Sequence, residues 1–297
     1  MSSPKRDGNV AAIAITIVIV GGLFVWFRVV EPRVGSCSVQ EVYRTAAPGG
    51  DLLLSKELCG SNGRRSFGII ERFSLVDPTT GQRVARAVMG GLPSYLGQAG
   101  SLWFLEDQSD LTTRDPLTLK ELASSDAIRA RYPALGPGIH GAKVDPVAQA
   151  VSVTDNQGRV VQIDGHDFAR VPGAPQQAAR RTRWKLTSGG DRASPVSPDG
   201  KTLGVSFLSP QLIDEAADPP SVLIASRESL DKTAPLRVDR VGADGKTLWT
   251  TTLSGQTKLW SAFLLTSTLA LVTRVDDDYR LTTLSLSDGA KVAQYDY

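Results

Sequence analysis

Short apolar runs separated by polar turns recur along most of this chain. In residues 102–122, an apolar run (102–105) is followed by a polar break (106–110) and then by an alternating run that enters and leaves Asp115-Pro116. Runs of about 4–8 residues rich in β-formers and bounded by Asp, Pro, Gly and Ser predict strands and hairpins. We therefore expect nearly all-β structure after residue 50. The outline of strand, Asp-containing turn and strand returns in residues 75–84, 162–171, 241–249 and 284–292.

The spacing of these turns indicates a repeat. Successive turn aspartates are 38, 49, 80 and 44 residues apart, counted along the set Asp77, Asp115, Asp164, Asp244 and Asp288. Because 80 is close to twice 40, we expect a degenerate unit in the long interval, around the Ser-Pro-Asp-Gly-Lys turn of residues 197–201. Periods of about 40–45 residues with four short strands each are typical of propeller blades. The prediction is an all-β chain with a single β-propeller of about six four-stranded blades over residues 51–297, with five or seven blades as alternatives.

The N-terminal segment has a different pattern. After a polar tail (1–9), no charged residue occurs between Gly8 and Phe27, and the centre is almost wholly aliphatic. About 20 such residues span the hydrocarbon core of a bilayer as a helix. A cleavable signal peptide is the main alternative, but its apolar region is usually about 7–15 residues and ends at small residues. The sequence therefore predicts an uncleaved transmembrane anchor at residues 10–30, followed by a linker at 31–50, with a first irregular strand over 31–48 as the alternative.

The two cysteines bear on the compartment. Cys37 and Cys59 are the only ones in the chain, and both follow the anchor. Such an isolated pair fits a disulfide formed in an oxidising compartment, with two unrelated free thiols as the alternative. Lys and Arg are nearly balanced on the two sides of the anchor, so the positive-inside rule decides nothing. We expect a single-pass protein of the inner (cytoplasmic) membrane, with its N-terminus in the cytoplasm and its domain in the periplasm or another extracytoplasmic space.

Composition excludes several classes of function. The 297 residues carry a formal net charge of +2, which is far from the basic balance of nucleic-acid-binding surfaces. With two His and two Cys, the chain is a poor candidate for a zinc site, which needs three or four ligands. Neither a nucleophile elbow nor a phosphate-binding glycine loop occurs. We expect no nucleic-acid partner, no metal, no cofactor and no catalytic residue.

Two charged segments are the candidate binding sites, and we interpret both as loops inserted in the repeat. One is basic and surrounds Trp184. The other, in residues 209–220, is acidic. The residues predicted to contact a partner are Arg180, Arg181, Arg183, Lys185, Asp214, Glu215 and Asp218. Arg is suited to anionic groups because its planar fork matches their geometry. The simpler interpretation of either segment is a solvated loop.

Other candidates are better explained structurally. The three aspartates at 276–278 are interpreted as a solvated turn rather than a calcium site. His166 and Asp167 are neighbours in a turn, where side chains rarely face each other, and His140 lies in a glycine-rich stretch. Residues 117–131 have the only pattern that favours a short helix within the repeat. Trp103, Trp249 and Trp260 lie in strand-like runs and are expected in the core.

Two turns also resemble a known superfamily. Asp77-Pro-Thr-Thr-Gly81 is similar to the strand-turn of quinoprotein-like and other bacterial envelope β-propellers, and Ser197-Pro-Asp-Gly-Lys201 resembles the turn of TolB-like and WD-like propellers. The resemblance implies a propeller over roughly residues 52–297. We therefore expect a membrane-anchored module that binds or scaffolds an envelope or membrane protein. A propeller enzyme or ligand-binding protein with a site at the central channel is the alternative.

Overall fold

The computed structural model describes residues 34–61, 69–90, 92–107, 109–169, 183–187, 190–216, 220–231, 233–276 and 278–297. The predicted polar tail and the predicted anchor at residues 10–30 lie outside these ranges. Within them, no helix has the length and apolarity needed to cross a membrane. The chain divides into two compact units, residues 1–37 with 59–70 and residues 38–58 with 71–297. In the first unit a disulfide joins Cys37 to Cys59, which confirms the predicted pairing.

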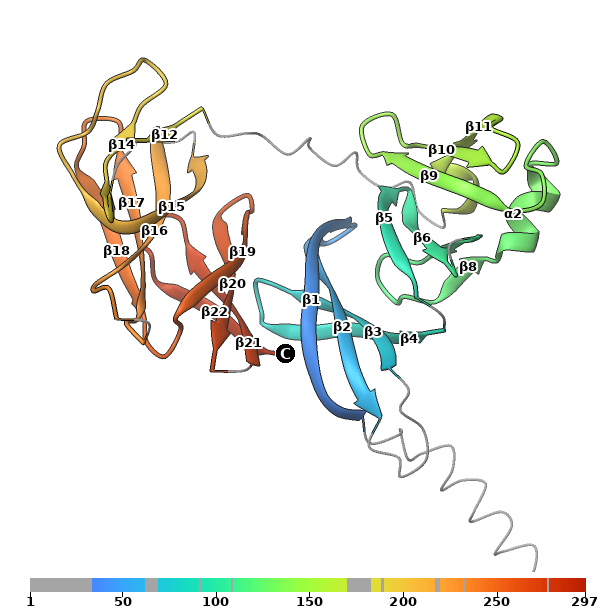
Figure 1. The fold of residues 1–297 in the computed structure, drawn as a ribbon, viewed down its shortest axis with the longest axis horizontal. Helices are drawn as coiled ribbons and strands as arrows, with labels where there is room; N and C mark the ends of the chain where they lie inside the picture. Colours follow the sequence, from blue (N-terminus) through green and yellow to red (C-terminus); the bar gives the residue numbers. More distant parts are fainter. Residues whose placement is uncertain are drawn as a thin grey trace, which may run out of the picture. The chain divides into compact units, whose positions relative to one another are not determined.

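Antiparallel sheets account for nearly all the regular structure of the described residues (Figure 1), which confirms the prediction of an all-β chain. The first sheet has the order β1 (Val34–Ala47), β2 (Gly50–Ser61), β3 (Ile69–Asp77), β4 (Gln82–Met89). The second has the order β5 (Ser94–Ala99), β6 (Ser101–Glu106), β7 (Asp110–Arg114), β8 (Glu121–Ala123). The third contains β9 (Ile139–Asp145), β10 (Ala150–Asp155) and β11 (Val160–Asp164).

The second half of the chain forms less regular sheets. A two-stranded sheet pairs β12 (Lys185–Leu186) with β14 (Pro195–Val196). The five-stranded sheet has the order β13 (Arg192–Ala193), β15 (Phe207–Ala216), β16 (Ser221–Arg227), β17 (Leu236–Gly242), β18 (Thr247–Leu253). The last sheet contains β19 (Lys258–Leu264), β20 (Thr268–Val275), β21 (Asp278–Ser285) and β22 (Lys291–Asp296). In the described residues, the helical elements are α2 (Ser125–Arg131), within the segment predicted to hold a short helix, and the 3₁₀ turn η1 (Gly165–Phe168).

The predicted turn aspartates occupy equivalent places in the sheets. Four of them connect the last two strands of a sheet, and Asp164 follows β11 in the same position. In every case the carboxylate accepts a hydrogen bond from the backbone N–H two residues further on, at 2.7–3.0 Å. Asp favours such turns because its short side chain satisfies the backbone locally. The repeat inferred from the sequence is therefore a structural repeat, and its turn chemistry explains the recurring aspartate.

Apolar cores join sheets that follow one another in the chain. Leu54 and Phe73 of the first sheet share a core with Leu102 and Phe104 of the second. The second and third sheets share another, around Trp103 and α2. A third core joins the five-stranded sheet to the last sheet. A further cluster combines the first sheet with the last: Val39, Leu53 and Val76 pack with Ala270, Val272 and Leu281. The first and last sheets of the second unit are thus neighbours in space.

The structure corrects part of the predicted outline. Residues 209–220 were predicted to be an acidic loop, but β15 continues to Ala216 and pairs with β16 through Asp214↔Leu223 and Glu215↔Val222. Two bulges interrupt this pairing, which explains why the alternation of the strand is hidden in the sequence. The segment 31–50 contains the whole of β1, which agrees with the alternative of a first strand rather than with a linker. The interval of 80 residues contains the small β12–β14 sheet, where a degenerate unit was expected.

Candidate functional site: a polar hollow on the five-stranded sheet

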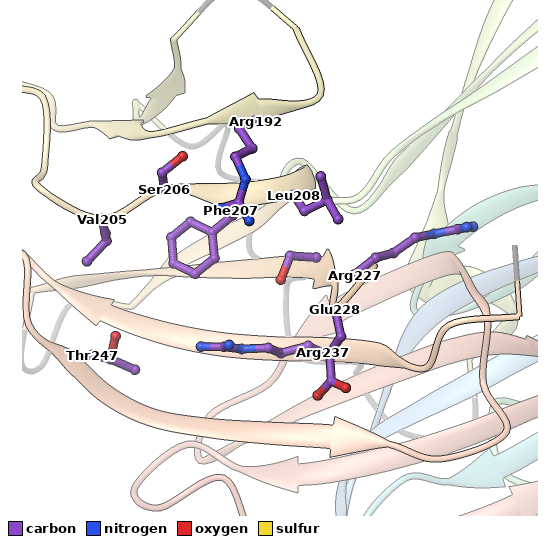
Figure 2. A pocket seen from close by; sticks show the side chains of 10 residues that line it. Arg192, Val205, Ser206, Phe207, Leu208, Arg227, Glu228, Arg237 and Thr247 are labelled. Carbon is purple, nitrogen blue, oxygen red and sulfur yellow. The ribbon is translucent and has the colours of Figure 1, made fainter. Parts of the chain in front are cut away.

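An open hollow of about 350 Å³ lies at the five-stranded sheet (Figure 2). Its lining comes from β13, the start of β15, the end of β16, β17 and the start of β18, so a single sheet supplies nearly all of it. The volume is at the lower end of the roughly 300–1,000 Å³ typical of ligand sites. The lining residues are Arg192, Val205, Ser206, Phe207, Leu208, Ser226, Arg227, Glu228, Arg237 and Thr247.

The apolar part of the hollow continues into a core. Phe207, only 6% exposed, belongs to a cluster with Trp184 and Leu203, and the half-buried Val205 packs against that cluster. Trp184 precedes β12 and therefore connects the small β12–β14 sheet to the face of the five-stranded sheet. Because this base is held by packing on several elements, the polar side chains around it have a rigid support.

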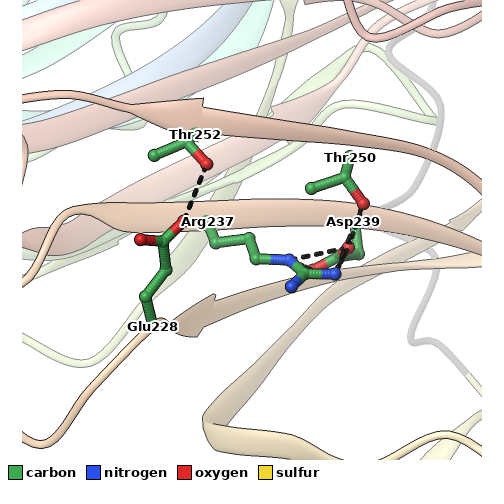
Figure 3. Close-up of polar contacts among 5 residues, drawn as sticks. All are labelled: Glu228, Arg237, Asp239, Thr250 and Thr252. Carbon is green, nitrogen blue, oxygen red and sulfur yellow. Dashed lines mark hydrogen bonds and ion pairs between the residues drawn. The ribbon is translucent and has the colours of Figure 1, made fainter.

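A buried carboxylate fixes one of the arginines (Figure 3). Arg237 donates from Nε to both oxygens of Asp239, at 3.0 and 2.9 Å, and from Nη2 to Oδ1 at 2.7 Å. Asp239 is fully buried, and its Oδ1 also accepts a hydrogen bond from Thr250 at 2.6 Å. The hydrogen bonds that Arg237 donates to Asp239 raise the pKa of the Arg237 guanidinium, which therefore stays charged. Such fork-shaped pairing gives the guanidinium a defined orientation.

The other two arginines differ in their partners. Arg227 donates from Nη2 to the carbonyl oxygen of Thr257 at 3.1 Å and from Nη1 to that of Asp231 at 3.4 Å. Arg192 is exposed, and its side chain makes no hydrogen bond or ion pair with the described residues. Glu228 is the one acidic residue of the lining and accepts a hydrogen bond from Thr252 at 3.1 Å. The lining therefore carries three positive charges and one negative charge.

This arrangement can bind an anion. Guanidinium groups recognise carboxylates and phosphates through paired N–H donors, and the hydroxyls of Ser206, Ser226 and Thr247 add donors nearby. None of the ten lining residues is a His, Cys or Lys, so the hollow lacks the groups that most often act as a base or nucleophile near neutral pH.

The structure places part of the predicted basic segment beside this site. Arg183 and Lys185 are exposed on either side of the buried Trp184, whose ring packs in the cluster of Phe207. The other two predicted residues of that segment, Arg180 and Arg181, lie outside the described residues. Of the acidic set, Asp214 and Glu215 lie in β15 and Asp218 lies outside the described residues. The structure does not bring Asp214 or Glu215 into the lining of the hollow, because β15 contributes to the hollow only with its first residues.

The remaining candidates have structural explanations. Asp167 pairs with Arg131 and Tyr132 rather than with His166. Trp103 and Trp249 are buried as predicted, but the prediction for Trp260 was wrong, since it is 41% exposed and lies against Lys258 and Tyr279. In the aspartate triplet, Asp276 lies in a turn and Asp277 is outside the described residues.

Sequence reasoning missed the arginines of the hollow. Arg192, Arg227 and Arg237 are 35 and 10 residues apart in the chain and have different local contexts. One signal was available: residues 236–242 read Leu-Arg-Val-Asp-Arg-Val-Gly, with two arginines and an aspartate inside an otherwise apolar strand. Charged residues in such a strand must be paired when buried, and this requirement indicates a polar network.

The described part of the chain is thus a series of antiparallel sheets, several of which share apolar cores, with a cationic hollow on one of them. No protein-family model matches the chain, and no curated protein was found to resemble it in sequence. Solved structures that are similar include a eukaryotic initiation factor (10% identity, TM-score 0.27), with 74% of this chain covered. The chain spans 59% of the length of that factor.

Two further similar structures cover more of both chains. BamB from Moraxella catarrhalis has 11% identity and a TM-score of 0.29, with 89% of this chain and 91% of that chain covered. The computationally designed Ika8 protein has 9% identity and a TM-score of 0.29, with 88% of each chain covered. These similarities are too distant to support an argument about fold or activity, so the function is argued from the chain itself.

Proposed function

We propose that this protein is a membrane-anchored β-propeller that binds a protein partner outside the cytoplasm. The observation that carries the proposal is the disulfide between Cys37 and Cys59, which uses both cysteines of the chain. Structural disulfides persist in oxidising compartments and are rare in the cytosol of mesophiles. The bond follows the apolar segment at residues 10–30, so it fits an anchor in the inner membrane with the following domain in the periplasm or an equivalent space.

The sheet order supports a propeller. Six sheets follow one another along the described chain, and five of them share the same aspartate turn after their third long strand. The shared core of the first and last sheets is what a closed ring of blades requires. In this proposal the sheets correspond to about six blades, of which the β12–β14 sheet is the degenerate one.

A binding role fits the charged surfaces of the second unit. Arg183 and Lys185 flank Trp184, and three arginines line the nearby hollow. Loops and rims held on a rigid scaffold are where binding most often occurs. Electrostatically complementary surfaces mainly raise the rate and specificity of association. A partner with an acidic surface in the cell envelope is therefore the expected ligand.

Mass mapping of the protein from its native membrane, without reduction, tests the compartment. We expect a linked pair of peptides containing Cys37 and Cys59. Protease added outside should leave the domain intact in whole cells and should cleave it in spheroplasts, from which the outer layer has been removed. Two free thiols in the native protein, or cleavage from the cytoplasmic side of inverted vesicles, would contradict the proposed location.

Affinity purification tests the binding role. We expect replacement of Arg180, Arg181 and Arg183 together by Ser to leave the fold intact, because substitutions of exposed residues such as Arg183 usually change stability by less than about 0.5 kcal/mol. Partner recovery should fall, and should fall further at high salt, since exposed charges are screened over about 10 Å at 0.1 M. The matched control is Arg83→Ser on the exposed edge strand β4. Equal recovery by all three proteins would show that the basic segment is only a solvated surface.

A further inference from the structure

We propose that the hollow on the five-stranded sheet binds carboxylate groups of an extended acidic segment in the protein partner. This inference rests on the proposed binding function and names the chemistry of the partner. It is carried by three features of the described residues: unsatisfied guanidinium donors, an apolar base beside them, and the position of the chain's own acidic residues.

The donors are available in two different ways. Arg192 is exposed and makes no hydrogen bond with the described residues, so its whole fork remains for a ligand. Arg237 uses Nε and Nη2 for Asp239 and Thr250, which leaves Nη1 as a donor in a group of fixed orientation. Figure 2 shows both guanidinium groups at the hollow, above and below the ring of Phe207. One exposed guanidinium, unpaired among the described residues, and one fixed by Asp239 suit a ligand with two or more carboxylates in succession.

The apolar base favours a peptide over a free inorganic anion. Phe207, Val205 and Leu208 line the same hollow as the arginines. A phosphate ion gains nothing from this surface, whereas a segment in which an aliphatic or aromatic residue accompanies acidic ones buries apolar area there. The hollow is open to solvent and draws its lining from five strands, so it offers contacts to several successive residues of a bound segment. The carboxylate of Glu228 repels any ligand carboxylate placed next to it. This repulsion limits the positions that the acidic residues of the bound segment can take in the hollow.

The chain's own acidic segment does not fill this role. Asp214 lies seven residues after Phe207 in β15, which at about 3.3 Å per residue places its backbone roughly 20 Å from the hollow. That separation is about twice the screening length at 0.1 M salt. Arg183 and Lys185, beside Trp184, instead extend the positive surface from the hollow. Asp214 is therefore too far along β15 to supply the carboxylate bound in the hollow.

The test is fluorescence anisotropy of the full chain in nanodiscs with a labelled decapeptide of Glu and Leu residues, beside its Gln and Leu counterpart. We expect binding of the Glu peptide only, weakened at least tenfold by Arg192→Gln, the loss expected from removing a charge-assisted contact. Glu228→Gln should strengthen binding about two- to threefold, because it removes the one opposing charge. Arg83→Gln on β4 is the matched control and should leave binding unchanged.

Each outcome decides the inference. Equal binding of the two peptides, or equal losses with Arg192→Gln and Arg83→Gln, overturns it. Complete displacement of the Glu peptide by millimolar inorganic phosphate also overturns the inference, if the Leu residues of the peptide add nothing to its affinity. The hollow would then be a site for small anions. Thermal melting of each variant distinguishes misfolding from lost contacts, and the Glu228→Gln gain cannot arise from misfolding. If the Arg192→Gln protein still captures its partner from membranes, the proposed function stands and only the acidic-segment inference fails.

Discussion

Asp167 shows how a residue that resembles part of a catalytic pair serves the fold instead. Arg131, the last residue of α2, donates to both of its carboxylate oxygens, at 2.7 Å from Nε and 2.6 Å from Nη2. The hydroxyl of Tyr132 donates to the same carboxylate and accepts from the backbone N–H of Asp164. Phe168 packs edge-on against the buried Trp103, 5.9 Å between ring centres. The polar contacts tie α2 to η1, and the aromatic contact seats η1 on the core.

These contacts make a pH-dependent contribution to stability. Hydrogen bonds from Arg131 and then Tyr132 lower the pKa of Asp167 to about 2. Since the folded-state pKa is below the unfolded value near 3.9, the stabilisation is complete above about pH 4 and is lost as the pH falls towards 2.

Asp167→Asn should therefore lower the free energy of unfolding at pH 7 by about 1 kcal/mol, as expected for a partly exposed pair. The difference from wild type should vanish near pH 2. Urea unfolding of both proteins between pH 2 and 7 measures this. The control is Asp126→Asn, whose side chain is 97% exposed and lies 3.8 Å from Arg129. A difference between wild type and Asp167→Asn that is independent of pH would contradict the assignment.

At the scale of the elements, one sheet holds the aspartate turn of the next. Trp249 of β18 donates its Nε1–H to the carbonyl oxygen of Leu286 at 2.8 Å, and Arg240 donates to the same oxygen at 2.6 Å. Thr251 donates to the carbonyl oxygen of Gly289 at 2.6 Å. Gly289 has φ +72°, and a Cβ there would lie 2.6 Å from a ring carbon of Trp249. The glycine after Asp288 is thus required both by the turn and by the indole that packs on it.

Trp249→Phe should destabilise the protein by about 1–3 kcal/mol, because it removes both the hydrogen bond and part of a buried ring. Trp260→Phe on β19 is a matched control: its ring is 41% exposed, so we expect a change below about 0.5 kcal/mol. Chemical denaturation followed by circular dichroism measures both. Equal effects of the two substitutions would mean that the contact at Leu286 adds nothing to the packing of the sheets.

How much of this could be predicted depended on whether the signal was local. The aspartate turns were found because an Asx turn is complete within about four residues, as at Asp77 and Asp288. The strand β15 was missed because its bulges and its acidic end disrupt the period-two pattern that marks a strand. The prediction for Trp260 was wrong because alternating side chains define the two faces of a strand, but the sequence does not show which face packs against another sheet.

The hollow was missed for a related reason. Its arginines come from three strands whose pairing is set by the order of the sheet rather than by any short motif. Only Arg237 had a local signal, the nearby Asp239 in an apolar strand. The predicted basic segment was nevertheless close, because Trp184 packs in the cluster of Phe207. The positive charge of the segment was visible in the sequence. The surface to which that segment belongs became visible only with the strand order of the five-stranded sheet.

At the scale of the whole second unit, the shared core of the first and last sheets makes the N-terminal strands depend on the C-terminal ones. Val39 and Leu53 of the first sheet belong to one cluster with Val272 and Leu281 of the last, and all four side chains are at most 1% exposed. Chain segments more than 200 residues apart then stabilise each other directly. In a linear array of sheets, by contrast, each sheet would depend only on its neighbours in sequence.

Leu281→Ala tests this dependence. A buried Leu→Ala substitution usually costs about 2–5 kcal/mol, and local opening then appears as faster amide exchange in the elements that share the cavity. We expect hydrogen–deuterium exchange to increase most in β20–β21 and in β1–β3, and least in β9–β11. The reciprocal control is Ile163→Ala in β11, fully buried in the core of the second and third sheets, which should raise exchange in β5–β11 and spare β1. If Leu281→Ala leaves β1–β3 as protected as β9–β11, the two ends of the chain do not share a core in solution, and a closed ring of sheets is ruled out.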